Sequence, residues 1–243
     1  GYFVMLSEAL RQATAGKVDL LADPAARMPA QFALRAEILN GIYPSIADCS
    51  PSSRPDEKAM RIICQRLGFA DLRWRTTETA GPSRSLCAAA LYSFLPPALP
   101  AVPGTVAQPE LGLRTWFKDG GVLICRPAPG GPDFAACLKG GNNAEHHNHN
   151  DVGSFSVVCG KTMMLCDPGS EVYTARTFSG KRYDSKVLSS FGHAVPVITG
   201  KLQRTGADAR AVVKRADFSD AEDVFELDIR SAYAVPELKQ LER

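Results

Sequence analysis

The sequence has few histidines, no long apolar run and almost no net charge. Only four of its 243 residues are histidine. No apolar stretch reaches the roughly 18 residues that a transmembrane helix needs, so no membrane partner is expected. The 28 basic and 26 acidic residues leave a formal charge of +2, which predicts no nucleic-acid partner. A polyanionic ligand would therefore have to meet a local basic patch.

The cysteines do not indicate a disulfide-bonded fold. The seven cysteines are odd in number and lack CxxC spacing, which excludes a disulfide scaffold and a zinc ribbon, and most are expected to be buried thiols. The first residues, GYFVMLSEAL, carry no basic leader and no initiating Met, so they do not form a signal peptide. We expect the chain to begin inside a longer protein. Its 45% of hydrophobic residues suffices for a buried core in one large domain or two small ones.

The chain changes character near its middle. Apolar spacing predicts helices in the first hundred residues, at 2–15, 29–40, 56–68 and 83–95. Residues 96–112 carry five prolines and indicate a linker. Beyond it, turn signals separate predicted strands at 115–127 (a hairpin around Asp119-Gly120), 133–139, 152–159, 162–167, 194–199, 209–214 and 223–233. We therefore predict a helical domain over 1–95 and an antiparallel β-sandwich over 113–243.

Three of the four histidines lie within four positions, in the segment 139–169. The segment reads KGGNNAEHHNHNDVGSFSVVCGKTMMLCDPG and contains His146, His147, His149 and Asp167. The fourth histidine, His193, follows in SFGHAVP. On a strand, residues two apart share a face, so His147 and His149 are expected to point the same way. Imidazole and carboxylate are the usual ligands of a zinc-type ion, which makes a metal site the leading interpretation.

Three other interpretations compete for this segment. A histidine-rich tract can be an exposed loop that scavenges metal incidentally, with His193 a separate core residue. A cupin-like barrel would fit His147 and His149, but it needs a Glu where the chain has Val152 to Ser154. The CGKT sequence resembles the end of a phosphate-binding loop, but that motif requires Gly where Phe155 stands.

Three blocks together carry a more specific resemblance. KGGNNAEHHNHNDVGSF, CDPGSEVYTARTFSGKRY and SFGHAVPVITGKLQRTG resemble, in this order and spacing, the heparinase II/III-like family of polysaccharide lyases. The resemblance covers most of the chain and is densest over 139–206. It implies an α+β multidomain fold, in which an incomplete α/α toroid precedes an antiparallel β-sandwich. The chain would hold the end of the toroid and the start of the sandwich, with both ends cut.

The resemblance also implies roles for individual residues. His149, Asp167 and His193 match the family's metal ligands, with zinc as the expected ion and Mn or another divalent ion still open. His147 matches an active-site histidine beside the metal. Whether the ion touches substrate or only orients this histidine is left open.

A catalytic base and substrate contacts are further implications of the resemblance. Tyr183 and Tyr173 compete for the role of base, and the block spacing favours Tyr183. Tyr2 matches a catalytic tyrosine of the toroid, whose other active-site residues would lie upstream of the chain. Arg176 and Arg182 are candidates for contacts with substrate carboxylates and for lowering the pKa of the base.

The implied activity is that of a carbon–oxygen lyase. The substrate would be an acidic polysaccharide or oligosaccharide containing uronic acid, such as heparin, heparan sulfate or alginate, cleaved by β-elimination. The implied location is the periplasm or exterior of a bacterium, with the cytoplasm as the alternative, and a homodimer is one oligomeric state left open. The competing hypothesis is a non-catalytic, metal-stabilised carbohydrate-binding β-sandwich, and a metal-dependent hydrolase is a third.

Overall fold

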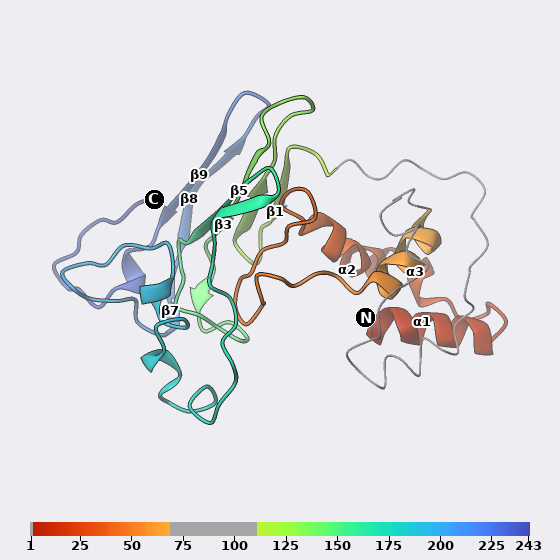
Figure 1. Cartoon of the computed structure of the whole chain (residues 1–243), viewed down its shortest axis with the longest axis horizontal. Helices are drawn as coiled ribbons and strands as arrows, with labels where there is room; N and C mark the ends of the chain where they lie inside the picture. The colour runs from red at the N-terminus through yellow and green to blue at the C-terminus, as the bar shows by residue number, and fades with distance from the viewer. Residues whose placement is uncertain (1, 69–110) are drawn as a thin grey trace. The chain divides into compact units, whose positions relative to one another are not determined.

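The computed structural model describes residues 2–68 and 111–243, which divide into two compact units (Figure 1). One unit contains the chain up to Arg35 and resumes at Pro55, and the other contains 36–54 together with 113–243. The described elements are a few helices and a larger number of antiparallel strands, a mixed α+β composition dominated by strands. The predicted helix at 83–95 and most of the predicted linker lie outside the described residues.

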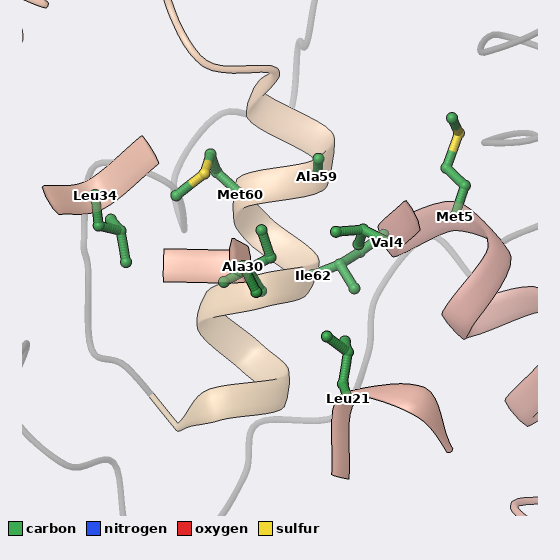
Figure 2. Close-up of a cluster of buried hydrophobic side chains, with 9 residues drawn as sticks. Val4, Met5, Leu21, Ala30, Leu34, Ala59, Met60 and Ile62 are labelled. Atoms are coloured by element: carbon green, nitrogen blue, oxygen red, sulfur yellow. The ribbon is translucent and has the colours of Figure 1, made fainter. Parts of the chain in front are cut away.

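The helical unit contains the helices α1 (Tyr2–Ala13), α2 (Pro24–Arg35) and α3 (Glu57–Leu67), and the 3-10 turn η1 (Leu20–Ala22). Helix α3 begins after Asp56, whose carboxylate accepts the backbone N–H of Ala59, and ends at Gly68 with a left-handed φ of 75°. Apolar side chains from all these elements form the unit's core, in which Met60 extends from α3 toward Leu34 and Ile62 meets Val4 (Figure 2). The predicted helices at 2–15 and 56–68 are confirmed, whereas α2 starts and ends earlier than predicted.

Five antiparallel strands form the main sheet of the second unit, in the order β1-β2-β3-β5-β6. They are β1 (Arg114–Phe117), β2 (Val122–Cys125), β3 (Phe134–Lys139), β5 (Phe155–Cys159) and β6 (Thr162–Leu165). The predicted hairpin around Asp119-Gly120 joins β1 to β2. Alternate residues of β3 are buried, and Ala135 and Cys137 pack with Ile38 and Ile42. The segment after α2 thus covers this face of the sheet.

Two smaller sheets complete the second unit. Strand β4 (Asn142–Asn143) pairs with β7 (Gly206–Arg210), and β8 (Val212–Phe218) pairs with β9 (Asp223–Asp228). Trp116 of β1 contacts Phe218 and Phe225 of this last pair edge-on, with ring centroids 6.2 and 5.1 Å apart. A second buried cluster around Val152 and Ile229 lies beside them.

Several sequence-based expectations differ from the structure. Residues 36–54 belong to the β-rich unit and not to the predicted helical domain, because Ile38 and Ile42 are needed to bury the sheet. The predicted strand 194–199 is reduced to a single bridge between Ile198 and Lys201, and the predicted strand 223–233 ends at Asp228. Of the six described cysteines, three are exposed, Cys125 is half-buried and two are buried, so the expectation that most are buried thiols is wrong. Among the described residues, no helix has the length and apolar character to cross a membrane.

Candidate metal centre and adjoining acid–base cluster

The histidine segment is a turn that follows β4, and not a strand on which His147 and His149 would share a face. His147 has a left-handed φ of 56°, which an L-residue adopts only when its surroundings hold it there. The consequence is a difference in burial: the His147 side chain is 64% exposed and that of His149 is 0% exposed. The two rings therefore do not share a strand face, although both reach the same carboxylate.

Three buried residues form a group that can hold a metal ion. One ligand atom from each of His149, Asp167 and His193 lies within 4.8 Å of the others. His193 Nδ1 is 2.8 Å from Asp167 Oδ2, and the two histidine rings have centroids 5.3 Å apart. His149 Nδ1 and His193 Nε2 are buried and have no hydrogen-bond partner among the described residues. Unsatisfied buried nitrogens are costly, and a bound cation would satisfy them.

Electrostatics also suit this group to a cation. Burial lowers the pKa of His149, and repulsion from His193 adds to this effect, while the hydrogen bond to Asp48 only partly opposes it. His149 is therefore neutral at pH 7, and neutral imidazole is the form that ligates metal ions. The predicted ligand residues thus come together with the required chemistry.

The loop that carries Asp167 is fixed by a second loop more than a hundred residues earlier. Ser45 Oγ donates to the carbonyl oxygen of Asp167 over 2.8 Å, and the Ser170 N–H donates to the carbonyl oxygen of Cys49 over 3.1 Å. Gly169 has a φ of 64°, and a Cβ there would lie 2.1 Å from that Cys49 oxygen. The two loops interlock because residue 169 has no side chain.

The second loop presents Asp48, which sequence reasoning missed. Its Oδ1 accepts from His149 Nε2 (3.0 Å) and from the Arg182 guanidinium (2.9 Å). Its Oδ2 accepts from His147 Nδ1 (2.9 Å) and from the Tyr173 hydroxyl (2.8 Å). Burial alone raises the pKa of the Asp48 carboxyl, but these four hydrogen bonds outweigh burial and lower it to about 2. Asp48 is therefore a carboxylate that is hydrogen-bonded both to His149 of the candidate metal site and to the exposed His147.

Tyr173 is the tyrosine that the structure brings to His147. Its hydroxyl oxygen lies 3.2 Å from His147 Nδ1, and its hydrogen bond to Asp48 raises the pKa of the phenol. The Tyr183 hydroxyl instead accepts from Asn148 Nδ2 over 2.9 Å, so Tyr183 positions the residue between the two histidines. Tyr173, and not Tyr183, contacts His147, and the choice between the two tyrosines as the base stays a prediction.

The two predicted substrate arginines are engaged within the protein. Arg176 donates to Glu171 over 2.6 Å. Arg182 donates to Asp48, and its Nε also donates to the carbonyl oxygen of Asn148 over 3.1 Å. Tyr2 is exposed at the start of α1 in the helical unit, and its catalytic role stays a prediction.

In comparisons with known proteins, no family model matches this chain and no curated protein sequence matches it. A functional assignment therefore rests on the residues and the geometry described above.

Proposed function

We propose that this chain carries the metal site and part of the acid–base machinery of a polysaccharide lyase acting on a uronic-acid glycan. The observation that carries the proposal is the position of the exposed His147 and Tyr173, which share the carboxylate of Asp48 with the buried ligand His149. The resemblance of three sequence blocks to the heparinase II/III-like family supports the same activity. On this proposal the helices are the end of an α/α toroid and the strands the start of a β-sandwich.

β-Elimination at a uronic acid makes two demands on a site. A base removes the C5 proton, and the bond between C4 and its glycosidic oxygen breaks, so a C4–C5 double bond forms and the oxygen leaves with a proton. Proton removal beside a carboxylate concentrates negative charge, which a nearby cation must offset. His149, Asp167 and His193 would hold a divalent ion, zinc being the best match to two imidazoles and one carboxylate, and the bound ion supplies positive charge.

His147 and Tyr173 suit the two proton-transfer roles. Because His147 Nδ1 faces the Asp48 carboxylate, its Nε2 is the nitrogen available to accept the C5 proton. Tyr173 donates its hydroxyl hydrogen to Asp48, and its raised pKa keeps the phenol protonated. We therefore assign the base role to His147 and the donation to the leaving oxygen to Tyr173. Tyr183, the base favoured from the sequence, becomes a positioning residue for Asn148.

The test is the formation of unsaturated uronides, followed by their ultraviolet absorbance. Because the family resemblance implies further toroid residues upstream, the assay uses the full-length protein on heparin, heparan sulfate and alginate. His147→Gln and Tyr173→Phe should each slow turnover by about 10²–10⁴-fold, the usual contribution of general acid–base catalysis. Tyr183→Phe should slow turnover less than these two variants. His146→Gln, a change at the adjacent exposed histidine, is the matched control.

Three results would reject the lyase assignment. The first is that metal-loaded protein forms no unsaturated product on any uronate polymer. Glycan binding without cleavage would favour the carbohydrate-binding β-sandwich, and saturated products would favour a metal-dependent hydrolase.

A further inference from the structure

Asp48 contacts the two histidines through opposite ring nitrogens. It faces Nδ1 of His147 at 2.9 Å and Nε2 of His149 at 3.0 Å. An ionised carboxylate only accepts hydrogen bonds, so each of these nitrogens must carry the hydrogen. The lone pair of a neutral ring then lies on the other nitrogen, which is Nε2 in His147 and Nδ1 in His149.

We propose that Asp48 is a positioning residue that holds His147 and His149 in opposite tautomers. In His149 it presents the buried, unpartnered Nδ1 to a metal ion, and in His147 it presents Nε2, on an exposed ring, to a substrate. One carboxylate would thus serve both a metal ligand and the residue that meets the substrate. The metal ion and the substrate in this proposal rest on the proposed function, but the tautomers do not.

The surroundings of Asp48 prevent the carboxylate from turning away. Its side chain is 5% exposed, and Arg182 and Tyr173 each donate to one of its oxygens. A carboxylate has about four acceptor positions, so both histidine contacts and these two donors fill it. Arg182 also donates to the backbone carbonyl of Asn148, which ties the carboxylate to the turn between the histidines.

Asp48→Asn isolates this role because it keeps the shape and replaces one acceptor oxygen with a donor group. The remaining oxygen can serve one histidine. The new NH₂ group faces either the ring N–H of His149 and the guanidinium of Arg182, or the ring N–H of His147 and the hydroxyl of Tyr173. At least one histidine must therefore lose its tautomer. Asp217→Asn is the matched control, since Asp217 is an exposed aspartate that also accepts from an arginine, Arg215, over 2.6 Å.

The experiment is nitrogen-15 NMR of the histidine rings in metal-free protein, at a mildly alkaline pH where neutral imidazoles dominate. Four histidines make assignment by single His→Gln variants practical. We expect Nδ1–H in His147 and Nε2–H in His149, with at least one of these lost in Asp48→Asn and both kept in Asp217→Asn. The Nδ1–H form is a distinctive signature, because a free imidazole side chain prefers Nε2–H. His193 Nδ1 also faces a carboxylate, that of Asp167, so the His193→Gln variant separates its signal from that of His147.

A second measurement follows Co²⁺ and Zn²⁺ affinity without any assay of activity. Loss of a carboxylate that orients a ligand histidine typically weakens metal binding by about 10–100-fold, and we expect this for Asp48→Asn. His147→Gln should leave the affinity within about twofold, because its ring is not a ligand.

Wild-type His147 in the Nε2–H form, or tautomers unchanged in a folded Asp48→Asn protein, would overturn the proposal. If Asp48→Asn does not fold by circular dichroism, the wild-type tautomers alone decide. The outcomes for Asp48 and for the lyase are separable. The expected tautomers in an inactive protein would reject only the lyase, and an active lyase with other tautomers would reject only the role of Asp48.

Discussion

His149 Nε2 lies 3.0 Å from Asp48 Oδ1, although 101 residues separate them in the sequence. The contact exists because the loop around Asp48 interlocks with the loop after β6, through Ser45, Gly169 and Ser170. The orientation of His149, a candidate metal ligand, therefore depends on a segment that lies between helices α2 and α3 in the sequence.

Removal of one ligand residue should abolish metal binding. His193→Ala deletes a ring whose Nδ1 lies 2.8 Å from Asp167 and whose Nε2 is buried without a partner among the described residues. Elemental analysis should find about one ion per wild-type chain and none in the variant. A chelator should lower the melting temperature of the wild type and leave that of the variant unchanged.

His146→Ala is the control for this measurement, because His146 is exposed and adjacent to the site without belonging to the buried group. It should retain the metal. Stoichiometric metal in His193→Ala would mean that the ion is held elsewhere.

Gly169→Ala should destabilise the β-rich unit and weaken metal binding. An alanine there would have to adopt a φ of 64° and place its Cβ 2.1 Å from the Cys49 carbonyl oxygen. The left-handed conformation alone costs about 1–2 kcal/mol, and separation of the two loops adds to this. Urea denaturation measures the loss of stability, and cobalt titration measures the loss of affinity.

Gly160→Ala provides a matched control for the conformational cost. Gly160 has a φ of 59°, but a Cβ there would meet no atom within 4 Å. The Gly160→Ala variant should lose about 1–2 kcal/mol of its free energy of unfolding and keep its metal affinity. Equal losses for the two variants would show that the interlock contributes nothing.

Local pattern was sufficient to predict the main sheet and two helices. Apolar periodicity and the turn at Asp119-Gly120 depend on neighbouring residues, and the structure agrees with both. The clustering of histidines indicated a metal site, and the resemblance of the three sequence blocks singled out His149, Asp167 and His193 as its ligands.

Asp48 could not be predicted, since no pattern in IADCSPSS distinguishes it from other loop aspartates. Its role arises only from contacts with residues about a hundred positions later. The different burial of His147 and His149 was missed for a related reason. It depends on a left-handed residue at 147, which alternation along a strand does not anticipate.

The buried ion pair between Lys139 and Asp151 should be important for the stability of the β-rich unit. Lys139 Nζ lies 2.6 Å from Asp151 Oδ1, and their side chains are 4% and 0% exposed. Burial alone would lower the pKa of Lys139, but the charges of Asp151 and Glu145 outweigh it and raise that pKa. Lys139→Met leaves a buried charge without its partner and should cost about 3–5 kcal/mol by urea denaturation.

The double variant Lys139→Met/Asp151→Asn is the control for that cost. It removes both charges and should recover part of the stability lost in Lys139→Met. A double variant no more stable than the single one would mean that lost packing, and not the unpaired charge, causes the effect.

The stability of the helical unit should depend on pH through Asp19. Burial raises the pKa of this carboxyl, but the hydrogen bond and charge of Arg66 outweigh it, so the pKa falls below its ordinary value of 3.8. A pKa that is lower in the folded state gives stability that is present above pH 3.8 and is lost as the pH falls through the folded value. Asp19→Asn should therefore lower the free energy of unfolding by about 1 kcal/mol near neutral pH and by progressively less below pH 3.8.

Denaturation followed by far-ultraviolet circular dichroism, which reports mainly on helices, measures this difference. Asp217→Asn in the β-rich unit should leave the helical signal unaffected, and a cost for Asp19→Asn that is constant with pH would exclude the ion pair as its cause.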